Sequence, residues 1–384
     1  MRIISFFTIF STLYGLFHLY AFLRARAALS FGKGVGFALA IFMAAMIFAP
    51  MLVRILERDA LELPARVVAF VGYIWMGFLF LFICASIVID LYRLVAYLIG
   101  LLVPGGASKI GLSVQYAFFS ALLAAVVITA YGLFEAGNIQ TEQITLKSPK
   151  IPERVGSLRI VQISDVHLGV IVREWRLERI LARVREARPD ILVSTGDLLD
   201  GQIDDISRLS GMLHEVNARY GKFAVTGNHE FYAGIDRSLD FTKKAGFSML
   251  RGETEELPEL IDIAGVDDPA GKSFGQFKGG SEKDLLTPPG RERFVLLLKH
   301  RPLLDREAIG LFDLQLSGHA HKGQIFPFTL FVRPFYPIIA GLLRLEKGSA
   351  LYVSRGSGTW GPPIRFLASP EVTIIDLVHG QGSR

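Results

Sequence analysis

The sequence is poor in cysteine, since Cys84 is the only one among its 384 residues. A lone thiol excludes an internal disulfide and leaves the redox compartment open. Internal repeats and low-complexity tracts are lacking as well. A basic excess is missing from residues 134–384, which hold 32 of the 41 Lys and Arg and 32 of the 36 Asp and Glu. Because an enzyme that acts on nucleic acid is expected to show a basic face, this balance argues against a nucleic-acid partner.

Apolar residues, by contrast, are abundant, at 51% of the sequence with a mean hydropathy of +0.41. That is too apolar for an ordinary soluble protein. The excess lies in residues 1–133, which also hold nine bases against four acids and so account for the pI near 9.2. Four apolar runs there reach the roughly 20 residues that a helix needs to cross a bilayer. They are Ile3 to Leu23, Val35 to Leu52, Val67 to Ile89 and Val114 to Leu133. We expect a transmembrane bundle of about four helices over residues 1–133.

Two details of this part bear on its role. The short apolar run Leu91 to Val103 begins beside Asp90 and Arg93, which are three residues apart. This spacing favours an extension of the third helix, or an interfacial segment, over a fifth span. His18 lies four residues from Tyr14, and we interpret it as a helix-packing residue rather than as part of a proton or metal path. No second ionisable side chain lies at the centre of a span, so a transporter is not expected.

Beyond a polar connector at residues 134–157, strands and helices alternate over residues 158–384, the expected catalytic domain. Apolar runs of strand length are Leu158 to Ile163, Ile191 to Val193, Phe223 to Val225 and Phe294 to Leu298. Trp175 to Ala187 has its apolar residues at helical spacing. A polar cluster follows each of the four strands, and a fifth stands alone; they cover residues 164–167, 196–200, 227–230, 299–301 and 318–321. In an α/β sheet the loops beyond the strand ends share one edge, so the five clusters should converge.

These clusters hold donors that suit a transition metal. Two Asp, four His and an Asn among their side chains offer nitrogen and oxygen atoms that suit zinc, manganese or iron better than calcium or magnesium. There are enough donors for two ions, and two ions about 4 Å apart can clamp the oxygens of an in-line displacement at phosphorus. The chemistry that follows is hydrolysis of a phosphate ester. A lone Asp-x-His occurs often by chance, but five clusters in order after strands do not.

In this order the clusters read Asp-x-His, Gly-Asp-x-x-Asp, Gly-Asn-His-Glu, a lone His and Gly-His-x-His, and they resemble the calcineurin-like metallophosphoesterases. The resemblance covers roughly residues 155–378 and implies a four-layer αββα sandwich. The C-terminal pieces Leu351 to Thr359 and Pro363 to Phe366 are similar to a branch of membrane-associated bacterial enzymes. Members of that branch are linked to the cleavage of UDP-2,3-diacylglucosamine, a lipid A precursor.

The resemblance also implies roles for single residues. The first metal would be held by Asp165, His167, Asp197 and His321. The second would be held by Asp197 as the bridge with Asn228, His300 and His319. His229 is similar to the family's histidine that contacts the phosphoryl oxygen and protonates the leaving group. Asp200 would orient its neighbours, or else cap a short helix.

The last cluster departs from the branch, which usually reads Gly-His-Thr-His-Gly-Gly-Gln. Lys322 stands where a Gly is usual. Lys322 and Arg301 are candidates for contacts with the substrate phosphate, although Lys322 can also simply face water. Behind His321, the stretch Ile325 to Leu345 is apolar with three prolines, which rule out a regular spanning helix. It is either core under the second sheet or an apolar, Arg-tipped lip for acyl chains.

We therefore expect a multi-pass protein of the cell (inner) membrane that hydrolyses a phosphodiester or pyrophosphate with two divalent metal ions (Mn, Zn or Fe). Membrane lipids and a phosphate ester, with a lipid-linked substrate such as UDP-2,3-diacylglucosamine as the leading example, are the expected partners. The alternatives are a tethered phosphodiesterase or phosphatase for soluble substrates and a non-catalytic scaffold with a retained metal site. Basic residues number six on one side of the spans and five on the other, which does not decide the orientation. A cytoplasmic catalytic domain is the expectation.

Overall fold

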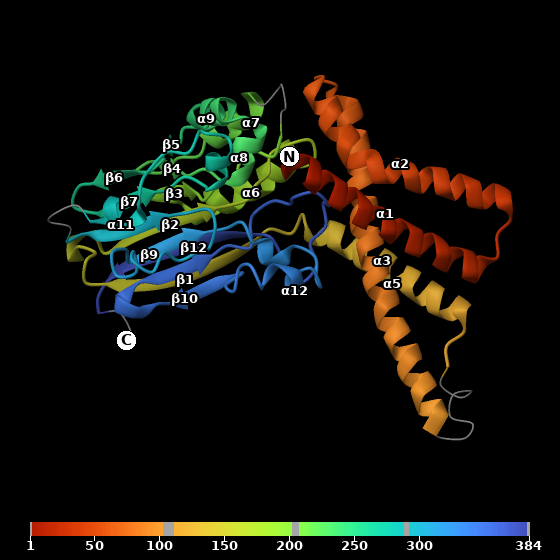
Figure 1. Cartoon of the computed structure of the whole chain (residues 1–384). Coiled ribbons are helices and arrows are strands. Elements are labelled where there is room, and N and C mark those ends of the chain that lie inside the picture. Colours follow the sequence, from red (N-terminus) through yellow and green to blue (C-terminus); the bar gives the residue numbers. More distant parts are fainter. Residues whose placement is uncertain (1, 103–110, 202–206, 288–291, 382–384) are drawn as a thin grey trace. The chain divides into compact units, whose positions relative to one another are not determined.

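The computed structural model describes residues 2–102, 111–201, 207–287 and 292–381. The chain divides into two compact units (Figure 1). The first comprises Met1–Phe134 with the short segment Gly361–Ile364, and the second comprises Glu135–Trp360 with Arg365–Arg384.

The first unit is helical. Its long helices are α1 (Arg2–Leu29), α2 (Lys33–Arg58), α3 (Glu62–Leu102) and α5 (Val114–Glu135). Each of the four apolar runs in the sequence lies within one of them. In the part of the chain that the structure describes, α2, α3 and α5 are long and apolar enough to cross a membrane. The expected N-terminal bundle of about four helices is confirmed.

Helix α3 is unusually long. It has 41 residues, or about 60 Å at 1.5 Å per residue, twice the roughly 30 Å of a bilayer core. Residues 91–102 continue this helix without a break, and Val103 lies outside the described residues. Arg93 lies 3.7 Å from the Asp90 carboxylate, which also pairs with Arg24 of α1 at 2.8 Å. Of the two favoured alternatives, an extension of the third helix and an interfacial segment, the structure shows a continuous helix.

His18 takes part in helix packing. Its Nδ1 lies 2.8 Å from the backbone carbonyl of Tyr14. Its Nε2 accepts a hydrogen bond of 2.8 Å from the indole of Trp75 on α3. Both ring nitrogens are thus engaged in contacts within and between helices, which agrees with the packing interpretation.

The second unit holds two six-stranded sheets. The first has the order β1-β12-β2-β3-β4-β5. Its strands are β1 (Gln140–Ser148), β12 (Glu371–His379), β2 (Ser157–Ile163), β3 (Ile191–Ser194), β4 (Lys222–Ala224) and β5 (Ser248–Met249). All neighbours are parallel except β12 and β2, which run antiparallel. The parallel run from β2 to β5 places the loops after these strands at one edge.

The second sheet has the order β10-β11-β9-β8-β7-β6. Its strands are β10 (Gly341–Arg344), β11 (Ala350–Val353), β9 (Leu314–Ser317), β8 (Phe294–Leu298), β7 (Ile261–Gly265) and β6 (Glu253–Leu257). The four central strands are parallel, and each edge strand is antiparallel to its neighbour. The loops after β8 and β9 therefore share an edge as well.

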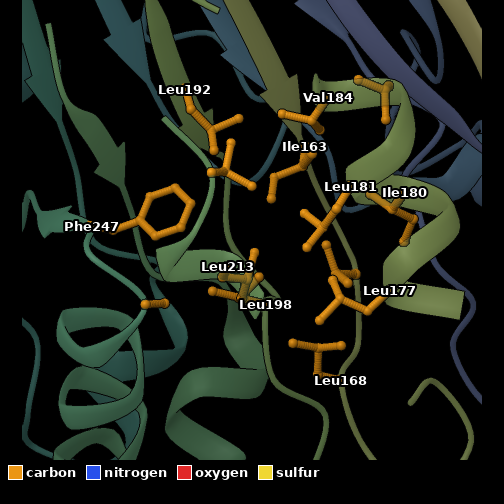
Figure 2. Packing of buried hydrophobic residues seen from close by; sticks show 14 of the residues in the cluster. Ile163, Leu168, Leu177, Ile180, Leu181, Val184, Leu192, Leu198, Leu213 and Phe247 are labelled. Atoms are coloured by element: carbon orange, nitrogen blue, oxygen red, sulfur yellow. The ribbon is translucent and has the colours of Figure 1, made fainter. Parts of the chain in front are cut away.

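Three apolar layers hold the sheets. Between the two sheets, Ile160 and Val193 of the first pack with Leu296 of the second in one buried cluster. On the outer face of the first sheet, helices α6 (Glu174–Ala187), α7 (Ser207–His214) and α9 (Ile235–Lys244) bury their apolar sides, as Figure 2 shows for Leu177 and Leu213. On the outer face of the second sheet lie the short helix α11 (Glu282–Leu286) and residues 308–312. This is the expected four-layer αββα order.

The connector expected at residues 134–157 contains strand β1. This strand pairs with β12 along its whole length, in register from Gln140 with Glu371 to Ser148 with His379. Its residues alternate between half-buried and exposed up to Lys147, because successive side chains of a strand point to opposite faces. Such a half-polar alternation looks like a linker by composition, although it is typical of a strand.

Candidate metal centre

Backbone hydrogen bonds tie the loops that carry the five clusters together. The amide of Asp165 donates to the carbonyl of Gly196 at 3.0 Å, and that of His167 donates to Asp197 at 3.0 Å. The amide of His319 donates to the Asp165 carboxylate at 2.9 Å. These bonds join loops that are separated in the sequence, so the expected convergence is present.

The backbone of these loops is unusual. Five non-glycine residues of the clusters have left-handed φ angles: Asp165 (51°), His167 (53°), Asp197 (51°), His319 (67°) and His321 (47°). Residues with a side chain adopt this conformation only at a cost of about 1–3 kcal/mol each, and such outliers gather at functional sites. The strained backbone of these loops directs the five side chains toward one place.

Asp165, His167 and His321 form one group whose ligand atoms all lie within 4.8 Å of one another. The Nε2 atoms of His167 and His321 are 3.1 Å apart. Nε2 of His321 lies 3.4 Å from Oδ1 of Asp165. Asp197 is close to this group too, because its Oδ2 lies 3.8 Å from Nε2 of His167.

Asp197, His300 and His319 form a second group. Nε2 of His300 lies 3.2 Å from Oδ2 of Asp197 and 3.0 Å from Nδ1 of His319. Nδ1 of His300 lies 2.8 Å from the Thr195 carbonyl, so it carries the proton and leaves Nε2 as the ligand atom. Asp197 therefore stands between the two groups.

The donor set fits divalent metal ions. Among the described residues the amide oxygen of Asn228 is buried and has no hydrogen-bond partner, which is costly unless a cation or water satisfies it. Two metal–nitrogen bonds of about 2.1 Å that meet at a right angle separate their nitrogens by about 3 Å. The two imidazole pairs, at 3.1 and 3.0 Å, have this spacing.

The electrostatics of the centre also favour a cation. Burial lowers the pKa of His300, but the carboxylates of Asp197 and Asp165 outweigh burial and raise it to about 10. The negative potential of these carboxylates, which favours a proton on His300, also favours a metal cation. At His319 and His321, burial and positively charged neighbours hold the pKa well below its usual range. Both rings are therefore neutral, as metal ligands must be.

Asp200 lies between two histidine rings. Its Oδ1 is 2.8 Å from Nδ1 of His229 and 3.4 Å from Nδ1 of His167. Burial raises the pKa of the Asp200 carboxyl, but hydrogen bonds to the two rings outweigh burial and hold it far below its usual range. Residues 202–206, on which the helix-cap alternative for Asp200 falls, lie outside the described residues. His229 lies close enough to His167 and Asp197 to form a third donor group with them.

Glu230 is a residue that the sequence reasoning passed over. Its carboxylate is buried and accepts backbone N–H groups from Asp197 at 2.9 Å, Leu198 at 2.7 Å and Gly227 at 2.6 Å. It thereby joins the second cluster to the third. Its place in Gly-Asn-His-Glu was the available signal, although the motif did not say which loop the side chain would hold.

Arg365 is a second such residue. Its side chain is fully buried and donates to the carbonyls of Arg355 at 2.7 Å, Gly358 at 3.1 Å and Ala368 at 3.2 Å. Its Nη2 lies 3.1 Å from Nδ1 of His321. The only sequence signal was its place in Pro363 to Phe366.

Arg301 and Lys322 are the two residues expected to contact substrate. Arg301 pairs with Asp268 through bonds of 2.7 and 3.0 Å. Burial lowers the pKa of Arg301, but Asp268 outweighs it and raises the pKa above its usual range. Lys322 is half-buried with a left-handed φ of 52°. Both cations stand within the loops that follow β8 and β9.

This chain is similar to known proteins over the region of the five clusters. A family model described as calcineurin-like phosphoesterase matches residues 158–323, which include all five clusters. An uncharacterized metallophosphoesterase of Aquifex aeolicus is 41% identical over 261 residues, covering 67% of this chain and 99% of that protein. One from Campylobacter jejuni is 34% identical over 265 residues, covering 66% and 69%. A transmembrane protein with a metallophosphoesterase domain from Danio rerio is 31% identical over 269 residues, covering 67% and 62%.

Proposed function

The chain belongs to the calcineurin-like metallophosphoesterases, and we propose that it hydrolyses a phosphodiester or pyrophosphate bond with two divalent metal ions. The observation that carries the proposal is the position of Asp197 between two donor groups, with the orphaned oxygen of Asn228 nearby. One carboxylate shared by two groups of ligands is what a dinuclear site requires.

We assign the ligands as follows. Asp165, His167, Asp197 and His321 would hold one ion, and Asp197, Asn228, His300 and His319 would hold the other. The mixed nitrogen and oxygen donors suit manganese, zinc or iron. When bound, such ions supply Lewis acidity at the phosphoryl oxygens and lower the pKa of a coordinated water.

The protein's own contribution to the reaction is orientation and proton transfer. Oδ1 of Asp200 lies 2.8 Å from Nδ1 of His229. With the proton on Nδ1, this contact would fix the tautomer and leave Nε2 for proton exchange. We assign to His229 the donation of a proton to the leaving oxygen. Glu230 accepts a hydrogen bond from the Asp197 amide and so fixes the backbone of the shared ligand.

The family includes proteins that carry transmembrane segments, and this chain is a membrane protein with three helices of spanning length among its described residues. A membrane enzyme has direct access to substrates carried by lipids. We therefore place a lipid-linked pyrophosphate or phosphodiester, of the kind of UDP-2,3-diacylglucosamine, first among the substrates to test, and a soluble phosphodiester second.

The test compares three substrates with the full chain purified in detergent and supplied with manganese. They are an aryl phosphodiester, an aryl monophosphate and UDP-2,3-diacylglucosamine. Metal content is measured in parallel, and two ions per chain are expected. Asp197→Asn should lose both activity and metal, while Asp236→Asn, an exposed carboxylate on α9, should retain both. Two bound ions without cleavage of any substrate would overturn the catalytic proposal and leave a scaffold with a metal site.

A further inference from the structure

The segment at residues 326–340, here named the apolar lip, lies between the last metal-site cluster and β10. It includes the short helix α12 (Thr329–Val332). Core packing was one of two expectations for this stretch, but most of its large apolar side chains are exposed, among them Leu330 (59%), Phe331 (60%) and Phe335 (74%). Exposed apolar surface of this kind marks a site of association.

The inner side of the lip is attached to the loop of the last cluster. The Thr329 hydroxyl donates to the Lys322 carbonyl at 2.9 Å. The amide of Phe326 donates to the carbonyl of Phe366 at 3.1 Å. These bonds hold the lip to two segments that both contact His321, since Arg365 next to Phe366 reaches that ring.

Tyr336 joins the lip to the metal centre itself. Its hydroxyl lies 2.8 Å from Nε2 of His319, and the two rings meet edge to face at 4.9 Å. Nδ1 of His319 faces His300. With Nδ1 as the ligand atom, Nε2 would carry the proton and donate it to the Tyr336 oxygen. Phe335, the preceding residue, points to solvent. Two consecutive residues thus connect an exposed apolar surface with a candidate metal ligand.

The charges around the lip indicate what covers it. From Lys322 to Leu345 the chain has three cations, Lys322, Arg333 and Arg344, and no acid. Aromatic and aliphatic side chains mixed with Arg, without acids, suit the boundary between acyl chains and phosphate headgroups. The chain is itself a membrane protein, so a bilayer is always within reach of a tethered unit.

We propose that the apolar lip dips into the headgroup and acyl boundary of the bilayer and receives the acyl chains of a membrane lipid whose phosphate enters the metal centre. Tyr336 is the positioning residue that holds the lip against His319. The assignment of the lipid as substrate rests on the proposed phosphoesterase function, whereas the insertion of the lip into the bilayer does not.

Insertion is tested by spin labelling of the full chain in nanodiscs of phosphatidylethanolamine and phosphatidylglycerol. Cys84→Ser removes the only cysteine, and Phe335→Cys then carries a nitroxide. Collision with oxygen, which concentrates in the bilayer, is compared with collision with a water-soluble nickel chelate. The matched control is Trp175→Cys on α6, whose side chain is 65% exposed.

The label at position 335 should collide mainly with oxygen and the label at 175 mainly with nickel. Equal nickel access at both positions would overturn the proposal. So would protection of position 335 from both reagents, because protein and not lipid would then cover the lip. Neither result depends on catalysis, so failure here is distinct from failure of the phosphoesterase proposal.

The substrate half is tested by a ratio of rates. The double variant Phe331→Ser with Phe335→Ser is compared with Trp175→Ser on an acyl-bearing phosphodiester in mixed micelles and on a soluble aryl diester. The ratio of the two kcat/KM values should fall about tenfold in the double variant, as the loss of two aromatic contacts with lipid implies. The control should keep the original ratio. Equal loss on both substrates in the double variant would refute a role in lipid recognition.

Discussion

The Oδ1 atom of Asp200 lies 2.8 Å from Nδ1 of His229 and so orients the ring that we propose as the proton donor. The same carboxylate lies 3.4 Å from Nδ1 of His167, a proposed ligand. One half-buried acid therefore lies beside both a proposed ligand and the proposed general acid. The two roles of Asp200 can be separated by experiment. Only the role that acts through proton donation by His229 depends on the leaving group of the substrate.

Asp200→Asn should lower kcat about 10–100-fold, the usual effect of losing an outer partner of a metal ligand. If His229 protonates the leaving group, the loss should be larger for an alkyl leaving group than for p-nitrophenolate, which departs without a proton. Rates on matched alkyl and aryl diesters provide the measurement. The same loss on both would show that Asp200 acts through His167 alone.

Asn228→Leu should reduce the bound metal from two ions to one. The substitution keeps the approximate size of the side chain but removes the oxygen that is buried without a hydrogen-bond partner among the described residues. Metal analysis of the purified chain measures the change. Asn228→Asp, which restores an oxygen, is the matched control and should keep two ions. A variant Asn228→Leu that still binds two ions would remove Asn228 from the ligand set.

Gly318→Ala should destabilise the protein and impair the centre. A Cβ atom at this position would lie 2.0 Å from Oγ of Ser164 and 2.1 Å from Oδ2 of Asp165. Overpacking of this kind costs about 1–3 kcal/mol. Gly211→Ala in the middle of α7 is the control, because among the described residues no atom beyond its chain neighbours and its helix backbone lies within 4 Å of its Cβ position. It should stabilise the helix by about 0.5–1 kcal/mol. In thermal unfolding, the unfolding temperature should fall for Gly318→Ala and rise for Gly211→Ala.

Asp376→Asn should remove a stabilising contribution that depends on pH. Asp376 of β12 stands opposite Arg159 of β2, and its Oδ1 accepts a hydrogen bond of 2.8 Å from that guanidinium. Burial raises the pKa of the Asp376 carboxyl, but the hydrogen bonds from Arg159 and Gln143 outweigh burial and lower it. A lowered pKa in the folded state means that the contribution is complete above the unfolded pKa of about 3.9 and is lost as pH falls through the folded value.

Unfolding temperatures of the wild type and Asp376→Asn should therefore differ at pH 7 and converge in acid. Because the Arg159 side chain is 38% exposed, the corresponding difference in the free energy of unfolding at pH 7 should not exceed about 1 kcal/mol. Asp240→Asn removes a more exposed pair with Lys244 on α9 and serves as the control. A gap between wild type and Asp376→Asn that stays constant down to pH 2 would show that packing, not charge, is responsible.

Arg365→Lys should be more harmful than a charge-conserving change suggests. Lysine has no planar fork, so several buried carbonyls that Arg365 serves would lose their donor, at about 1–3 kcal/mol for each unsatisfied group. The expected result is a large fall in unfolding temperature and weaker metal binding through His321. Arg179→Lys, an exposed position on α6, should change neither. Normal stability of Arg365→Lys would contradict the role of this side chain as a donor to the loop.

The sequence by itself determined the elements and most of the candidate site. Apolar runs of spanning length predict α2, α3 and α5, because the bilayer imposes a length that composition reveals. Strand β2 and the Asp165 that follows it are likewise local signals, since a short buried run and a polar residue at its end need no knowledge of the rest of the chain. The family resemblance implied that Asp200 orients its neighbours, but the contact with His229 came from the structure.

Only the tertiary structure decided which distant residues support that site. Tyr336 reaches His319 across 17 residues and Arg365 reaches His321 across 44. No periodicity records such pairs, because the partner of a buried polar group depends on the path of the whole chain. The same reason hides β1: its half-polar alternation becomes a strand only when β12, more than 200 residues later, offers its edge.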